Sequence, residues 1–198
     1  MKRAAAELLL ALLLVVIAPV SQSSIIVFTE SLSGPQESPP NASPGTGLAT
    51  ITLNTGAGTL HVVVTFSGLL GTTTASHIHC CTPLPRTGTA MVATTTPTFA
   101  GFPFGVTSGS YDNVLDLMLA SSYNPMFVAA EGGTVAGAET ALIAGMLAGE
   151  TYLNIHTTVV PGGEIRGFLP AAAPEPTTIA LLGIGLASFA VSRRRKLT

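Results

Sequence analysis

Three histidines have the residue type and spacing best suited to chemistry. His77 and His79 are separated by one residue, and His156 lies in a later segment of similar character. Residues two apart on a β-strand point to the same face, so His77 and His79 can reach one ion together. Three imidazoles suit Zn²⁺ or Cu²⁺, and Glu37 or Glu164 could add an oxygen ligand. The pattern therefore defines a candidate metal site.

A second interpretation of the same histidines is structural. Their rings could hydrogen-bond to neighbouring strands, or to the hairpin that carries Glu164 and Arg166, and so fix the geometry of a β-sandwich. A His-x-His strand also occurs in Cu/Zn superoxide dismutase, but that enzyme uses more histidines and a bridging ligand than this chain supplies. His61 is the only other histidine. We favour the structural interpretation here, and so expect no obligatory cofactor.

The sequence carries no signature of catalysis. It has no phosphate-cradling glycine loop, no Gly-x-Ser-x-Gly elbow and no His-Glu-x-x-His helix. Glu164 and Arg166 share a face by the period-two rule, but such a pair is far more often a surface or rim ion pair than half of a catalytic site. Their alternative partners are Asn154 or Glu37 across the sheet. We therefore predict a protein that is not an enzyme, with a redox-active metalloprotein as the alternative.

Two adjacent cysteines, Cys80 and Cys81, follow the second histidine. Side chains of neighbouring residues normally point apart, which disfavours a bond between them. Reduced thiols, a disulfide between the neighbours and intermolecular pairing all remain open, as does ligation of a metal beside His79.

The segments that carry these residues alternate apolar and polar side chains, which is typical of β-strands. Leu60, Val62, Val64 and Phe66 share one face of such a strand, and a turn at residues 55–58 precedes it. The pattern predicts strands at residues 25–32, 48–53, 60–66 and a segment ending at 77–79, weaker ones near 90–95 and 106–119, and a final hairpin of 152–158 with 164–169.

One short helix interrupts this pattern. Thr134 is a suitable cap for its start, Leu142 and Met146 fall at helical spacing, and Gly149 is a natural stop. Many short strands with one late helix predict a mainly β fold, an antiparallel β-sandwich that is immunoglobulin-like or superoxide-dismutase-like.

The charge of the predicted domain excludes one class of partner. Residues 25–170 hold two basic and eight acidic side chains, a net charge of −6. Nucleic-acid binding needs clustered Lys and Arg against phosphate, so we predict none.

The first 24 residues have the pattern of a secretory signal peptide. Lys2 and Arg3 precede ten apolar residues at 8–17, and small or polar residues follow. We expect a signal helix there and an exported protein.

The C-terminal end has the pattern of a membrane segment. Pro174, Glu175 and Pro176 are followed by residues 177–191 without a charge, and then by a basic run, Arg193, Arg194, Arg195 and Lys196. Fifteen helical residues reach about 22 Å, less than the hydrocarbon core of about 30 Å. The basic run should stay in the cytoplasm, which leaves Pro-Glu-Pro on the outer side.

This tail resembles the PEP-CTERM sorting signal. The resemblance implies a Gram-negative bacterium, a transmembrane helix held in the inner membrane during sorting, and processing by an exosortase. It further implies delivery to the cell surface or to an extracellular exopolysaccharide matrix.

The domain between the two ends resembles a chordin-type (CHRD) domain. The motifs that carry the resemblance are, in order, residues 32–40 (LSGPQESPP), 77–79 (HIH), 152–157 (YLNIHT) and 163–167 (GEIRG). In animals this family occurs in an extracellular protein that binds signalling ligands. The sequence thus predicts a signal peptide at 1–24, a CHRD-like β domain at 25–170, a linker at 171–176 and a transmembrane segment with a basic tail at 177–198. Its predicted role is binding or structure outside the cell, with extracytoplasmic Zn or Cu binding as the alternative.

Overall fold

The computed structural model of the chain describes residues 24–170, so the predicted signal helix, linker and transmembrane tail lie outside the described residues. Seven antiparallel strands form one sheet in the order β4-β6-β7-β1-β2-β3-β5. Their bounds are β1 Ile25–Ser33, β2 Thr46–Asn54, β3 Thr59–Ser67, β4 Thr73–His79, β5 Gly109–Asp116, β6 Tyr152–Thr157 and β7 Ile165–Phe168. The prediction of a mainly β, antiparallel fold is confirmed. Within residues 24–170 no helix is long and apolar enough to cross a bilayer.

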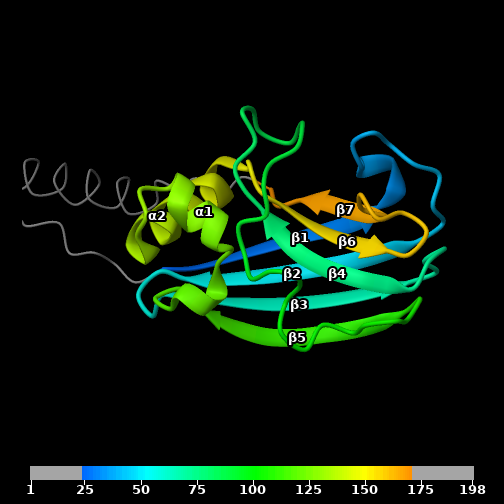
Figure 1. The fold of residues 1–198 in the computed structure, drawn as a ribbon, viewed down its shortest axis with the longest axis horizontal. Helices are drawn as coiled ribbons and strands as arrows, with labels where there is room; N and C mark the ends of the chain where they lie inside the picture. Colours follow the sequence, from blue (N-terminus) through cyan, green and yellow to red (C-terminus); the bar gives the residue numbers. More distant parts are fainter. Residues whose placement is uncertain (1–23, 171–198) are drawn as a thin grey trace, which may run out of the picture.

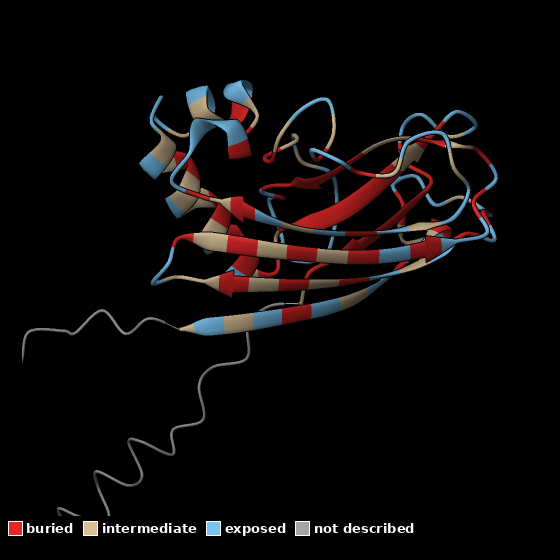
Figure 2. Cartoon of the chain, turned by 90° about the horizontal axis from the view of Figure 1, so that it is seen from below, coloured by how far each residue is buried: buried red, intermediate tan, exposed pale blue. Residues whose placement is uncertain are grey.

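The alternation in the sequence determines which face of each strand is buried. On β3, Leu60, Val62, Val64 and Phe66 are all buried, as predicted, while the residues between them are partly or fully exposed. Figure 2 shows this banding along the strands, with buried residues alternating with intermediate and exposed ones. The turn between β2 and β3 is closed by Asn54, whose side-chain oxygen accepts hydrogen bonds from the backbone of Gly56 and Ala57.

The sheet curls, so that β4 and β6 lie in front of β1 and β2 in Figure 1. A single apolar core fills the space between them, joining Ile78 of β4 and Leu153 and Ile155 of β6 to Phe28 and Ile51 of the other half. The two layers of the predicted sandwich are therefore formed by one continuous sheet. The burial of these side chains is the main interaction that stabilises the curled sheet. It contributes a free energy of about 25 cal/mol for each Å² of apolar surface removed from water.

Helices cover one end of the curled sheet (Figure 1). The predicted helix is α2 (Val135–Ala148): the Thr134 side chain accepts from Gly137 N at its start, and Gly149 ends it with φ 74°. A shorter helix that the sequence analysis did not predict, α1 (Pro125–Ala130), is capped by Asn124. Two 3-10 turns, η1 (Gly34–Gln36) and η2 (Ala120–Ser122), follow β1 and β5.

The weaker strand predictions differ from the structure in the connection between β4 and β5. The predicted strand at 90–95 is absent, because Ile78 N donates to the Thr94 side chain and the backbone of Ala93 and Thr94 both bond to Ile78 O. This pattern leaves only isolated bridges, such as His79 with Val92. The predicted strand at 106–119 is shortened to β5. The connection runs along the free edge of β4, where it bonds to the backbone of Ser76, Ile78 and Cys80, and it provides part of the candidate site.

Candidate metal centre

The edge of the sheet brings the three histidines together. Ile78 points into the core, so His77 and His79 on either side of it point outward from β4. On β6, Leu153 and Ile155 are core residues, so His156 also points outward. The ladder pairs His77 with Asn154 and Ala75 with His156, which makes His77 and His156 diagonal neighbours on one face.

The three rings form a compact cluster. Their centroids are separated by 4.9 Å between His77 and His156, 5.5 Å between His77 and His79, and 6.0 Å between His79 and His156. One ring nitrogen from each histidine lies within 4.8 Å of the corresponding nitrogens of the other two. This spacing allows all three nitrogens to contact one ion after small side-chain movements, since Zn–N bonds are about 2.0–2.1 Å long.

The second nitrogen of each ring is held by a loop carbonyl. His77 Nε2 lies 2.7 Å from Pro97 O, His79 Nδ1 lies 2.9 Å from Ala90 O, and His156 Nδ1 lies 2.9 Å from Pro161 O. A carbonyl oxygen accepts only, so each of these nitrogens carries the proton and donates. Metal-ligating histidines nearly always donate their outer N–H to a carbonyl, carboxylate or water in this way, which fixes both the tautomer and the ring orientation.

The remaining nitrogens are buried and unpaired. His77 Nδ1, His79 Nε2 and His156 Nε2 have no hydrogen-bond partner among the described residues. A buried acceptor without a partner loses free energy of solvation, and such atoms in native proteins need an explanation. A ligand shared by the three rings would satisfy these nitrogens together.

Burial keeps the rings neutral, which is the form that binds metal. Desolvation lowers the pKa of His77 to about 4, with a further contribution from His156. Desolvation likewise lowers the pKa of His79 to about 4, although the hydrogen bond to Ala90 opposes it. The pKa of His156 is also lowered by burial. At neutral pH all three free nitrogens are therefore lone-pair donors.

Tyr152 lies on β6 directly opposite His79 in the ladder and supports the cluster from there. Its ring stacks on that of His79, with centroids 4.6 Å apart and planes 9° apart. Its hydroxyl accepts from Ala90 N at 3.2 Å and donates to Ala90 O at 3.3 Å. Tyr152 thus holds both the ring of His79 and the loop carbonyl that orients it.

The other ligands considered from the sequence do not join the cluster. Among residues 24–170, the only group of histidine, cysteine and acidic side chains spaced for a metal is that of the three histidines. Glu37 faces Arg166 instead, at 3.8 Å. Cys80 and Cys81 form a disulfide with each other and pack on α2 at Ala141 and Gly145. Three imidazoles with a further coordination position open fit Zn²⁺ or Cu²⁺.

Glu164 has a structural role that the sequence indicated only in outline. It is fully buried, and its carboxylate accepts hydrogen bonds from four groups: Ser43 Oγ, Thr157 Oγ1, Leu70 N and Gly71 N. Burial opposes its ionisation, but these four bonds together lower its pKa. The expected surface or rim ion pair between Glu164 and Arg166 is wrong: both side chains are buried and they have different partners.

Arg166 is a second buried charge, and the structure places Asn154 and Glu37 beside it. It lies on the outer face of β7, paired in the ladder with Asn154. Its Nε donates to Gln36 O and its Nη1 donates to Gly88 O, so it joins the η1 loop to the loop after β4. The sequence offered one signal for it, because only Arg86 and Arg166 are basic in the whole domain.

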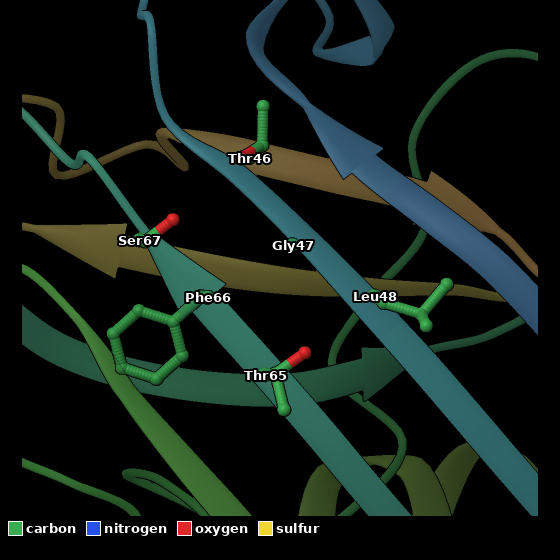
Figure 3. Close-up of a pocket in the computed structure, with 6 residues that line it drawn as sticks. All are labelled: Thr46, Gly47, Leu48, Thr65, Phe66 and Ser67. Atoms are coloured by element: carbon green, nitrogen blue, oxygen red, sulfur yellow. The ribbon is translucent and has the colours of Figure 1, made fainter.

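A further hollow lies over the ends of β2 and β3 and has a volume of about 420 Å³. Its lining residues are Thr46, Gly47, Leu48, Thr65, Phe66 and Ser67 (Figure 3). None of these side chains is ionisable, so the hollow has no group suited to acid–base or metal chemistry.

Comparisons with known proteins agree with both resemblances. Residues 28–169 match the family model of the CHRD domain, and residues 172–196 match that of the PEP-CTERM protein-sorting motif. No curated protein and no solved structure gave a significant match. The sorting residues Pro174, Glu175, Pro176 and 193–196 lie outside the described residues. The motif implies export and membrane sorting by an exosortase. Because the first match covers most of the chain, this protein belongs to the CHRD-domain family and carries a PEP-CTERM sorting motif.

Proposed function

We propose that the CHRD domain binds one transition-metal ion, Zn²⁺ or Cu²⁺, through His77, His79 and His156, and acts at the cell surface or in the extracellular matrix. Two observations support this: one ring nitrogen from each histidine lies within 4.8 Å of those of the other two, and each ring has one buried nitrogen without a hydrogen-bond partner among the described residues. The second nitrogen of each ring is tied to a carbonyl, so the tautomers already suit a metal. This geometry favours the metal site over the purely structural role that we preferred from the sequence.

The proposed role is binding rather than catalysis. Among residues 24–170 no carboxylate belongs to the three-histidine cluster, which gives the site ligands for a metal but no acidic member. The open coordination position instead suits an incoming ligand, such as a donor group of a matrix component. Copper would add redox chemistry to the same site, and a redox assay of the copper-loaded protein tests that alternative.

Metal titration of the exported protein tests the proposal. Protein purified after export, stripped with a chelator and titrated with Zn²⁺ or Cu²⁺ should bind one equivalent. The His77→Ala variant should lose affinity by more than the roughly 10–100-fold that the loss of an outer partner costs. His61→Ala is the matched control, because His61 pairs with Asp112 at 2.7 Å on another part of the sheet. No stoichiometric binding, or equal binding by His77→Ala, would overturn the proposal.

A further inference from the structure

A pocket next to the metal centre gathers the cationic side chains of the domain. It has a volume of about 360 Å³ and lies over β7, between the η1 loop and the loop after β4. Its lining includes Arg86 and Arg166, the only Lys or Arg side chains within residues 24–170. Placing both at one pocket, in a domain of net charge −6, creates a local site for an anion.

Arg166 is fixed in place before any ligand arrives. Its side chain is buried, and its guanidinium carbon lies 4.7 Å from the ring centroid of Tyr152 and 5.1 Å from that of Phe168. The bonds to Gln36 O and Gly88 O use two of its five N–H donors. A guanidinium held in this way binds a carboxylate with little loss of side-chain entropy, and such charge-assisted bonds are strong.

Each of the two arginines has one acidic neighbour, and neither pair is a close, hydrogen-bonded ion pair. Glu37 Oε2 is 3.8 Å from Arg166 Nε, too long for a hydrogen bond, and Glu37 Oε1 is buried without a partner. Burial raises the pKa of Glu37 to about 7, against the opposing effect of Arg166, so its negative charge is incomplete at neutral pH. Arg86 is 3.7 Å from Glu30 and its side chain is 53% exposed, which makes that ion pair weak and exchangeable.

We propose that this pocket binds a hydroxylated carboxylate of the size of one sugar acid. The carboxylate would lie between Arg166 and Arg86, and a hydroxyl would donate to the carboxyl group of Glu37, which lines the pocket. Pro35 and Pro40 line the rim and offer apolar surface to the C–H face of a sugar ring. A volume of about 360 Å³ is within the usual range of small-molecule sites, about 300–1,000 Å³.

Binding of glucuronate, measured by calorimetry with the exported protein, tests this proposal. Glucuronate should bind, while glucose, which lacks the carboxylate, should bind at least tenfold more weakly. Arg86→Gln should weaken glucuronate binding tenfold or more, and this variant should fold normally because the side chain of Arg86 is 53% exposed. Glu37→Gln should weaken glucuronate binding more than the binding of a simple carboxylate such as acetate.

The controls separate this site from the metal centre. Protein stripped of metal with a chelator should bind glucuronate as the untreated protein does, so failure of the metal proposal would leave this result unchanged. Glu131→Gln, which alters an acid outside the pocket, should also bind normally. Equal affinity for glucose and glucuronate, or unchanged glucuronate binding by Arg86→Gln, would overturn the proposal.

Discussion

The imidazole rings of His77 and His156 lie 4.9 Å apart, although neither residue is the ladder partner of the other. They are diagonal neighbours across β4 and β6. His79 lies two residues after His77 on β4, and its ring lies beside those of the other two. Because all three rings also donate to loop carbonyls, the sheet sets their positions and the loops set their orientations. The geometry of the three-histidine cluster thus depends on both the edge of the sheet and the connections that cover it.

The support that Tyr152 gives to His79 can be tested without removing a ligand. Tyr152→Phe keeps the stacked ring but removes both hydrogen bonds to Ala90. We expect Zn²⁺ affinity to fall about tenfold, at the lower end of the range for outer partners of a metal ligand. Tyr123→Phe is the control, because it also removes one hydroxyl bond, to Leu117 O, but at a distance from the site. Equal affinity in the two variants would contradict the positioning role of Tyr152.

Glu164 should be essential to the stability of the domain. Oε1 accepts from Ser43 and Leu70, and Oε2 accepts from Thr157 and Gly71. Glu164→Gln replaces one acceptor oxygen with an NH₂ group that faces two donors, and hydrogen bonds to a charged group contribute about 1.5–3 kcal/mol each. We expect the free energy of unfolding to fall by about 3 kcal/mol or more in urea denaturation.

Glu131→Gln serves as the control for that measurement. Glu131 is only partly buried, and surface substitutions of this kind usually change stability by less than about 0.5 kcal/mol. If Glu164→Gln were as stable as this control, the four-bond network would not stabilise the fold.

The raised pKa of Glu37 predicts a specific pH dependence of the free energy of unfolding. Its pKa is raised from 4.5 to about 7 in the folded state. The folded state therefore holds this proton more tightly than the unfolded state, so the contribution of Glu37 to stability is greatest below pH 4.5 and is lost as the pH rises to about 7. Across this window the free energy of unfolding of the wild type should fall by about 1–2 kcal/mol relative to that of Glu37→Gln. This is less than the whole pKa difference implies, at about 1.4 kcal/mol for each pKa unit.

Urea denaturation of both proteins at several pH values between 4.5 and 8 checks this prediction. Other titrating groups, including the three histidines, are common to both proteins and cancel in the difference. A difference in stability that stays constant with pH would show that Glu37 titrates normally.

The period-two alternation in the sequence predicted most of the strands and the shared face of His77 and His79, and the cap residues Thr134 and Gly149 predicted the ends of α2. These features depend on neighbouring residues, which the sequence displays directly. It did not predict that β4 lies beside β6, because this pairing joins segments far apart in the chain and is decided by packing of the whole sheet. The free nitrogen of each histidine also depends on a loop carbonyl, which no local pattern reveals.

The burial of Glu164 and Arg166 illustrates the same limit. Their spacing predicted that they share one face of a strand, and their charge predicted that they lie at the surface. In the structure each is buried against partners from distant loops, such as Ser43 and Gly88. Buried charges require such partners, and these partners are contributed by tertiary structure.

The sorting motif predicts processing of the C-terminus. The exported chain should lack Arg193 to Lys196, because the PEP-CTERM motif implies exosortase processing at the membrane. Replacing Pro174, Glu175 and Pro176 with alanine should leave a full-length chain in the membrane fraction. Intact-mass spectrometry of the exported and membrane fractions checks both outcomes, and an exported wild-type chain that retains its basic end would contradict them.

X-ray absorption spectroscopy of the Zn²⁺-loaded, exported protein tests the metal centre most directly. We predict three imidazole nitrogens, with one further light-atom ligand, at the usual Zn–N distance of about 2.0–2.1 Å. A sulfur shell at about 2.3 Å, or a coordination shell without histidine, would contradict the assignment of the site to His77, His79 and His156.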